Sequence, residues 1–159
     1  MILEDVTISE ILEFGKTITQ DELKYYDDFD AKSIIQKGVY AKGIKINRRL
    51  IGIGGFMRTY GVNNTFYMIK KEYQGKGLGN FITENNIAYA KRHKIPLLFY
   101  ICSTANAPII HAIKKYGDKE VCIHKDKRYS YIGITNKGKL MGYFLPIVVR
   151  LFVLIKKRS

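Results

Sequence analysis

The feature that most constrains the fold of this chain is a glycine-rich hexapeptide, Gln74-Gly75-Lys76-Gly77-Leu78-Gly79. It follows an apolar run with the composition of a strand, Thr65 to Ile69, and precedes a segment typical of a helix, Asn80 to His93. Glycines at a strand-to-helix turn let the backbone approach a ligand, and the first turn of a helix offers unpaired N–H groups. Together with the positive end of the helix dipole, this arrangement predicts a binding site for phosphate or pyrophosphate.

Two common glycine-rich loops do not match this hexapeptide. The P-loop requires Gly-x-x-x-x-Gly-Lys followed by Ser or Thr, and the sequence contains no such string. The dinucleotide-binding fingerprint requires Gly-x-Gly-x-x-Gly, whereas the glycines here stand at 75, 77 and 79. The pattern that fits is Gln/Arg-x-x-Gly-x-Gly/Ala, and the stretch from Ile69 to Gly79 resembles strand 4 and the pyrophosphate loop of the GCN5-related N-acetyltransferases.

A second motif, downstream, supports the same resemblance. A strand-like run from Pro96 to Ile101 is followed by Asn106 and by a helical segment that closes at Tyr116-Gly117. In this superfamily an Asn begins that helix and a Gly follows eleven residues later, and Asn106 and Gly117 keep the spacing. The resemblance implies an α+β fold: a mixed, mostly antiparallel central sheet, splayed between strands 4 and 5 and flanked by helices.

Length and composition agree with one domain that has one core. The chain has 159 residues, 47 % of them hydrophobic, which suffices for one sizeable core. We predict an acyltransferase domain over residues 1–139 and an apolar C-terminal extension with a basic end over residues 140–159. Cys102 and Cys122 lie in apolar runs without metal-ligand spacing, so we expect reduced thiols and no metal site. Glu4-Asp5 directly follows Met1-Ile2-Leu3, which argues against a signal peptide, and we expect a cytoplasmic protein.

The order of the expected elements is that of an acetyltransferase of this type. The segment Thr7 to Phe14 has a short helical pattern, and the capping box formed by Thr19 and Glu22 starts a second helix toward Tyr26. No clear first strand is expected, because the run from Ile2 to Val6 is short and interrupted by acidic residues. The remaining expected elements are strands at 38–47 and 50–59, a turn at 61–64, strand 4 at 66–71, the two motifs described above, and strands at 120–124 and 128–135.

Charge is distributed unevenly along the chain. Residues 1–40 carry four Lys/Arg and nine Asp/Glu, a net charge of −5, and residues 41–159 carry 23 and five, a net charge of +18. Together they give the net +13 of the whole chain. A basic body attracts anions such as the phosphates of CoA, nucleic acid or an acidic membrane surface, although a lysine-rich soluble surface explains the charge equally well.

The resemblance implies acetyl-CoA as the cofactor. The pantetheine arm would pair with the strand from Phe66 to Lys71, whose backbone would also polarise the thioester carbonyl. The N–H groups of Gly75 to Asn80 would hold the pyrophosphate, and Lys76 either adds charge or is a solvated surface residue. The predicted cofactor-binding residues are Met68, Ile69, Lys71, Gln74, Gly75, Lys76, Gly77, Leu78, Gly79, Asn80 and Asn106.

The catalytic acid and base are where the sequence departs from the family pattern. Members often carry a Tyr seven residues after the helix-starting Asn, and that position is Ile113 here. Of the other proton donors in the region we favour Tyr116, whose alternative role is an aromatic residue packed at a helix end. No carboxylate occurs between residues 62 and 69, so the base is either His124 or a water relay. The further candidates are His111, Tyr129 and Tyr131 as acids and Asp126 beside His124.

An acidic and aromatic segment is the candidate site for the acceptor amine. The run Tyr25-Tyr26-Asp27-Asp28-Phe29-Asp30 interleaves carboxylates with rings, a combination that suits a cationic amine. In the family, the loop between the first two helices lines the acceptor pocket. We therefore predict Tyr25, Tyr26, Asp27 and Asp28 as substrate-binding residues, with a solvated helix end as the alternative.

The C-terminal run from Leu140 to Ile155 contains one Arg and no other charged residue. It is shorter than the roughly 20 apolar residues that span a bilayer, and Pro146 and Arg150 interrupt it. Three interpretations remain open: a buried element or dimer seam, an interfacial membrane anchor, and a contact surface for another protein. The sequence does not distinguish a monomer from a homodimer.

Three classes of function follow from these features. The leading one is an acetyl-CoA-dependent N-acetyltransferase, in which a primary amine attacks the thioester directly. The second is an acyltransferase-like protein that modifies or binds nucleic acid or a translation component. The third is a non-catalytic CoA-binding module, which the absence of the usual Tyr favours.

Overall fold

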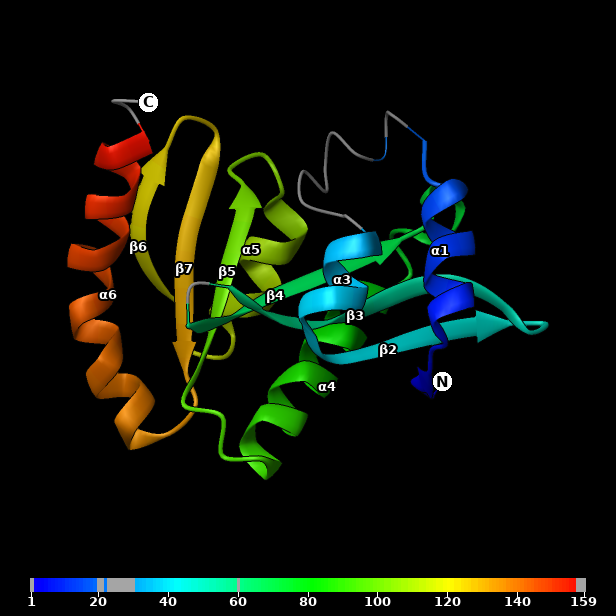
Figure 1. The fold of residues 1–159 in the computed structure, drawn as a ribbon, viewed down its shortest axis with the longest axis horizontal. Coiled ribbons are helices and arrows are strands. Elements are labelled where there is room, and N and C mark those ends of the chain that lie inside the picture. Colours follow the sequence, from blue (N-terminus) through cyan, green and yellow to red (C-terminus); the bar gives the residue numbers. More distant parts are fainter. Residues whose placement is uncertain (1, 20–21, 23–30, 60, 157–159) are drawn as a thin grey trace. The chain divides into compact units, whose positions relative to one another are not determined.

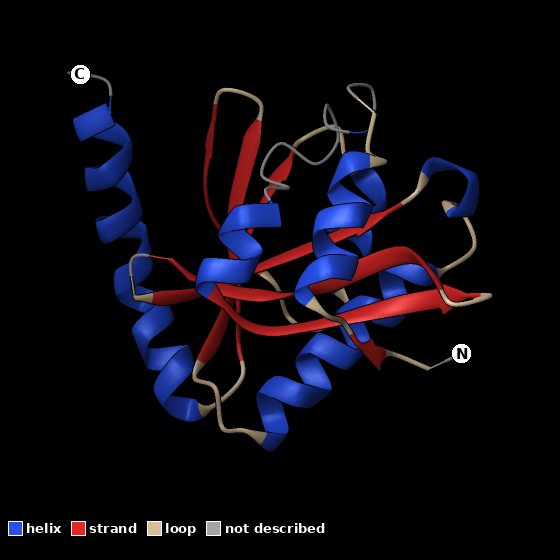
Figure 2. Cartoon of the chain, turned by 45° about the vertical axis from the view of Figure 1, so that its right-hand side comes forward, coloured by secondary structure: helices blue, strands red, loops and turns tan. Residues whose placement is uncertain are grey.

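The computed structural model describes residues 2–19, 22, 31–59 and 61–156, and side chains within these ranges up to residue 149. The chain divides into two compact units, residues 1–86 and 87–159, and the division falls inside helix α4 (Leu78–Arg92). Both units combine helices with antiparallel strands (Figure 1, Figure 2). The predicted fold class, α+β with mostly antiparallel strands and flanking helices, is confirmed.

The first unit is built on an antiparallel sheet of four strands in the order β1-β2-β3-β4. A two-residue turn joins β2 to β3, with Asn47 and Arg48 both at positive φ, as a tight hairpin requires. The elements of this unit are β1 (Glu4–Asp5), α1 (Ile8–Lys16), α3 (Ala31–Lys37), β2 (Gly38–Ile46), β3 (Arg49–Thr59), β4 (Val62–Ile69), the 3₁₀ helix η1 (Lys71–Tyr73) and the first part of α4.

Two apolar clusters cover the two faces of this sheet. Because successive side chains of a strand point to opposite faces, Met68 and Ile69 at the end of β4 belong to different clusters. Met68 packs in the cluster that includes Ile11 and Phe14 of α1. Ile69 packs in the cluster that includes Ile82 of α4. The end of β4 is therefore held from both sides, which fixes the start of the glycine-rich loop.

The second unit contains the antiparallel strands β5, β7 and β6, in that order. Arg128 on β7 is buried and forms ion pairs with Asp118 and Glu120 and a hydrogen bond with Ser130, so its charge is compensated. Helix α6 runs alongside β6 and β7 (Figure 1). The elements of this unit are the remainder of α4, β5 (Leu97–Ser103), α5 (Ala107–Lys114), β6 (Lys119–His124), β7 (Lys127–Gly133) and α6 (Asn136–Lys156).

Three details of the expected order are wrong. A first strand does exist, because Glu4 and Asp5 pair with Gly43 and Lys42 of β2. β4 begins at Val62, inside the segment expected to be a turn, because the whole run from Val62 pairs with β3. Helix α3 was not predicted. The Thr19 and Glu22 capping box is present in the hydrogen bonds, but the helix expected to follow it lies outside the described residues.

The C-terminal apolar run is helical. It belongs to α6, which begins at Asn136, four residues before the predicted extension, and continues through Pro146. No helix among the described residues has both the length and the apolar character needed to cross a membrane.

Candidate functional site

The glycine-rich loop begins where β4 leaves the sheet. The last ladder bond is donated by the Lys70 N–H to the carbonyl of Ile51, at 3.0 Å. The next N–H, that of Lys71, donates to Oε1 of Glu22 at 2.9 Å, so a side chain replaces the neighbouring strand at this point. The chain then turns through η1, and the Tyr73 N–H donates to the Lys70 carbonyl at 2.9 Å.

Gln74 closes this turn with its side chain. Its Nε2 donates to the carbonyl of Ile69 at 2.9 Å, which ties the start of the loop back to the end of β4. Gln74 was predicted to contact the cofactor. Within the described structure, the side-chain amide of Gln74 instead bonds to the backbone of β4. The groups left to contact a ligand are the backbone N–H groups of the residues that follow.

The loop itself is open and lined with hydrogen-bond donors. Gly75 and Gly77 have φ values of +74° and +78°, and an added Cβ at either would meet no atom within 4 Å. Among the described residues, we find no hydrogen bond from the N–H of Gly75 or Gly77. The first helical bond of α4 runs from the Phe81 N–H to the Gly77 carbonyl, at 3.1 Å, so the preceding N–H groups have no intrahelical acceptor. This is the geometry of an anion site at a helix N-terminus.

Three lysines add positive charge near this loop. Lys70 and Lys71 directly follow β4, and Lys76 lies within the loop with its Nζ 5.2 Å from the ring centroid of Tyr73. Leu78, the first residue of α4, is buried at 5 % exposure and anchors the helix in the apolar cluster below. The contact predicted between Leu78 and the cofactor is one through the Leu78 backbone.

A pocket of about 500 Å³ lies beside the loop, within the first unit. Its apolar part comes from β2 and β3, and Tyr73, Lys76 and Leu78 connect it to the loop. Lys45 on its wall is already bound to Glu10 at 2.6 Å, so Lys76 is the cation best placed to meet a ligand there. The remaining lining residues are Ile2, Glu4, Ile44, Ile46 and Ile51.

Glu22 is a site residue that the sequence indicated only as part of a capping box. It is buried at 6 % exposure, and it accepts hydrogen bonds from the Thr19 N–H and hydroxyl, both at 2.8 Å, as well as from the Lys71 N–H. Burial raises the pKa of Glu22, but the N–H groups of Thr19 and Lys71 and the Thr19 hydroxyl outweigh it, and the net pKa is lowered. Glu22 is thus a buried carboxylate that stays charged and holds the loop entrance.

The second unit contains the remaining predicted residues. Asn106 is the N-cap of α5: its Oδ1 accepts from the Ile109 N–H at 3.4 Å, and its own N–H donates to the Ser103 carbonyl at 3.0 Å. Ile113, at the expected Tyr position, is fully buried, so this position offers no acid.

The two predicted catalytic residues are not brought together. His124 ends β6, whereas Tyr116 precedes the start of this strand by three residues. At about 3.3 Å per residue, the six residues of β6 keep the two side chains well apart. Tyr131 is buried, with its ring against Gly142 of α6, and His111 is exposed. At most one of Tyr116 and His124 can therefore act at a single reaction centre.

The predicted acceptor residues Tyr25, Tyr26, Asp27 and Asp28 lie outside the described residues. Both cysteines are free thiols, and burial raises the pKa of Cys102. A search of the described part of the chain finds no group of three or more His, Cys, Asp or Glu that could hold a metal ion.

Comparison with solved structures identifies the fold. The chain superposes on the ribosomal-protein-S18-alanine N-acetyltransferase from Escherichia coli with a TM-score of 0.66 at 14 % identity, covering 84 % of this chain and 94 % of the other. It superposes on yncA, a putative acetyltransferase from Salmonella typhimurium solved with its cofactor acetyl-CoA, with a TM-score of 0.69 at 13 % identity, covering 86 % and 95 %.

A third match is a phosphinothricin acetyltransferase of the GNAT superfamily from Sinorhizobium meliloti in complex with acetyl-CoA, with a TM-score of 0.64 at 12 % identity, covering 83 % and 87 %. No protein-family model and no curated protein sequence matches this chain. The chain therefore has the fold of the GCN5-related N-acetyltransferases, as the two sequence motifs indicated.

Proposed function

We propose that this protein is an acetyl-CoA-dependent N-acetyltransferase that acts on a primary amine. The observation that carries the proposal is the loop from Gly75 to Asn80. Its two positive-φ glycines have open space around them, and the N–H groups that precede Phe81 in the helix that follows have no intrahelical acceptor. Similar folds have been solved with acetyl-CoA, which supports this cofactor over other phosphate-bearing ligands.

The residues of the first unit fit such a ligand. The N–H groups of Gly75 to Asn80 would bind the pyrophosphate, and Lys76 would add a charge-assisted contact. The backbone of Met68, Ile69 and Lys71 would bind the pantetheine arm, although the Ile69 carbonyl already accepts from Gln74 and the Lys71 N–H already donates to Glu22. The resemblance assigns Asn106 to the same ligand. When bound, acetyl-CoA supplies an acetyl group activated as a thioester.

The chain's own contribution to proton transfer is modest in this proposal. A free thiol has a reference pKa of about 8.5, so the departing sulfur needs little help from an acid. Tyr116 as the acid and His124 as the base are alternative proposals for a single centre, and they are tested by Tyr116→Phe and His124→Gln. A loss of kcat in one variant with an altered pH profile would assign the role to that residue. Unchanged kcat in both variants would favour a water relay.

The acceptor is proposed from charge. Tyr25, Tyr26, Asp27 and Asp28 would bind a cationic amine through carboxylates and ring faces. Two similar structures are ribosomal-protein-alanine N-acetyltransferases, from E. coli and Brucella melitensis, so peptides with a free N-terminal alanine belong in the amine panel. Charge reversal of Asp27 and Asp28 is expected to raise the amine KM and leave acetyl-CoA affinity unchanged. An unchanged amine KM would remove this assignment.

The decisive experiment is calorimetric titration of acetyl-CoA into three purified proteins. The wild type is expected to bind in the micromolar range, and Gly77→Glu to bind roughly 100-fold more weakly, because it puts a carboxylate where the pyrophosphate would lie. Gly61→Glu is the matched control. Gly61 also has positive φ and open space around it, in the turn between β3 and β4, so it carries the same strain and the same added charge. Equal losses in the two variants, or no binding to the wild type, would overturn the proposal.

Turnover is tested separately, with the amine panel and release of the CoA thiol as the readout. Thiol release that depends on an amine establishes the transferase. Binding of acetyl-CoA without turnover of any amine would instead support the non-catalytic CoA-binding module, for which the buried Ile113 is the specific observation.

A further inference from the structure

Helix α6 has an inner face on which two glycines allow close packing. Gly138, Gly142 and Leu145 are buried and follow one another at helical spacing. A Cβ at Gly138 would lie 1.6 Å from the Pro96 carbonyl oxygen, and one at Gly142 would lie 2.1 Å from the ring of Tyr131. The inner face of the helix therefore packs directly against Pro96 and Tyr131. The opposite face of the helix is turned away from the strands.

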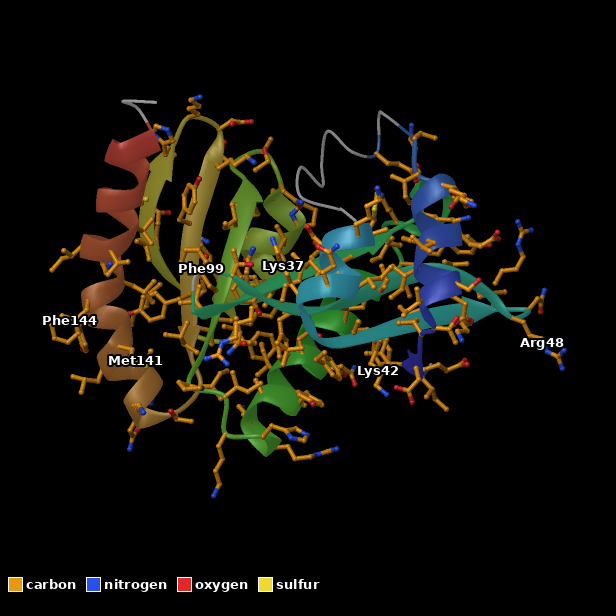
Figure 3. All side chains as sticks on the ribbon, viewed as in Figure 1. Lys37, Lys42, Arg48, Phe99, Met141 and Phe144 are labelled. Atoms are coloured by element: carbon orange, nitrogen blue, oxygen red, sulfur yellow. The ribbon has the colours of Figure 1, made fainter. Side chains whose placement is uncertain are left out.

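The outer face of α6 is apolar and exposed. Phe144 projects on the side away from β6 and β7 (Figure 3). Single exposed apolar side chains are ordinary on a protein surface, but a contiguous group of them on one helix marks a binding surface. The group, named here the α6 stripe, has exposed fractions between 40 % and 69 %: Leu140, Met141, Tyr143, Phe144, Ile147 and Val148.

The formal charge on helix α6 is of one sign. Lys137 and Lys139 lie on the first turns of α6, and both are exposed. Lys119 on β6 places its Nζ 5.5 Å from the ring centroid of Tyr143. From Asn136, where α6 begins, to the end of the sequence there are six Lys/Arg and no Asp/Glu. An apolar stripe is thus bordered by cations and has no carboxylate on its own helix.

We propose that the α6 stripe binds the surface of an anionic lipid bilayer. Apolar side chains enter the boundary between headgroups and acyl chains, and lysines at the border reach the anionic headgroups with their apolar stems in the interface. A second copy of the chain would bring one set of lysines against another, which opposes self-association through this face. A nucleic acid would use the cations but would leave the apolar side chains exposed. The inference does not depend on the proposed enzymatic activity.

The test is sedimentation of the full chain with vesicles. We expect binding to vesicles of phosphatidylcholine and phosphatidylglycerol in equal parts, weaker binding to phosphatidylcholine alone, and a loss of binding as salt is added. Ile147→Glu is expected to weaken binding to the anionic vesicles at least roughly tenfold, because it removes a large apolar contact and adds a like charge. The double variant Lys137→Gln, Lys139→Gln is expected to weaken binding to the same vesicles and leave the weak binding to phosphatidylcholine unchanged.

The matched control is Ile8→Glu at the start of α1. Ile8 is 61 % exposed and Ile147 is 60 % exposed, so the two substitutions add the same charge at equally accessible helical positions. Thermal unfolding of each variant checks that it is folded. Equal weakening by Ile8→Glu and Ile147→Glu, or no binding of the wild type to either kind of vesicle, would overturn the proposal. A wild-type dimer in size-exclusion chromatography that Ile147→Glu dissociates would do the same and assign the stripe to a second copy.

Discussion

Glycines serve opposite purposes in the loop before α4 and in α6. Gly75 and Gly77 have positive φ and open space around them, so what matters there is the backbone conformation. Gly138 and Gly142 lie within a regular helix, and a Cβ at either would overlap a neighbouring residue, so what matters there is the missing side chain. The open space around Gly75 and Gly77 can hold a ligand, whereas the space beside Gly138 and Gly142 is filled by neighbouring residues that pack against the helix.

Because of this difference, substitutions of glycine should affect ligand binding in the loop and stability in α6. Substitution of a loop glycine should reduce ligand affinity at a modest conformational cost. Substitution of an α6 glycine should reduce stability and leave ligand affinity unchanged. The following variants test that contrast in order of expected size.

Gly138→Ala is expected to have the largest effect on stability, a loss of about 3 kcal/mol, because its Cβ would meet a backbone carbonyl that cannot rotate away. For a chain of this size this loss lowers the Tm by about 6–12 °C, measured by circular dichroism. Acetyl-CoA affinity should not change. Lys137→Ala, at an exposed position of the same helix, is the control and should stay within about 0.5 kcal/mol of wild type. A stabilised Gly138→Ala variant would mean that α6 does not rest on Pro96.

Gly142→Ala is expected to cost less, about 2 kcal/mol, because the atoms in its way are at the far end of the Tyr131 ring, which can shift. Urea unfolding of this variant, of Tyr131→Leu and of the double variant forms a cycle. A coupling energy of at least about 0.5 kcal/mol is expected, because the smaller side chain makes room for the Cβ. Strict additivity would contradict the contact between the two residues.

Gly77→Ala is expected to cost about 1 kcal/mol of stability, the cost of a left-handed conformation for a residue with a Cβ. Gly61→Ala should cost the same, since its φ is +79° and its surroundings are equally open. The two variants should differ in calorimetry with acetyl-CoA, which Gly77→Ala alone should weaken by roughly tenfold. Equal affinities would show that the loop does not approach the ligand closely.

Glu22→Gln is expected to have the smallest effect, roughly 0.5–1 kcal/mol at neutral pH, because glutamine has one oxygen for the two acceptor positions that Glu22 fills. Since the pKa of Glu22 is lowered in the folded state, its contribution is fully present above the unfolded pKa and is lost as pH falls through the folded pKa. The difference in Tm between wild type and variant should therefore close in acid.

The exposed Glu13 provides the control for this pH dependence. Glu13→Gln removes the same charge at an accessible position of α1 and should change the Tm little at any pH. A difference in Tm between wild type and Glu22→Gln that does not narrow as the pH is lowered from neutral into acid would contradict the pKa argument.

Much of the fold could be predicted because its signals are local. The hexapeptide from Gln74 to Gly79 imposes a strand-to-helix turn through the backbone freedom of glycine, and Asn106 caps α5 where the spacing predicted it. Strands β5, β6 and β7 lie where strand-like runs of ordinary length predicted them. The prediction of a turn before β4 was wrong because a non-local contact overrides the local preference. Asn63 and Asn64 favour turns, but they pair with Arg58 and Met57 of β3, and this pairing extends the strand through them.

The candidate site was only partly predictable. The hydrogen bond from the Lys71 N–H to Glu22 joins residues 49 positions apart, and no local sequence pattern predicts it. The sequence offered Tyr116 as a candidate acid and either His124 or a water relay as the base, and it did not show how far apart Tyr116 and His124 lie. The six residues of β6 between them make the use of both untenable at one centre.

The sequence by itself determined the glycine-rich turn, the capped helix after β5 and the resemblance to the acetyltransferases, because each depends on the backbone preferences of a few neighbouring residues. Only the tertiary structure decided that the Ile113 position is closed to an acid, that Glu22 stays charged at the loop entrance, and that α6 keeps one face against the strands and exposes the other. Burial and close contact arise between residues distant in the chain. A local pattern in the sequence therefore does not predict such burial or contact, because both form only when the fold brings distant residues together.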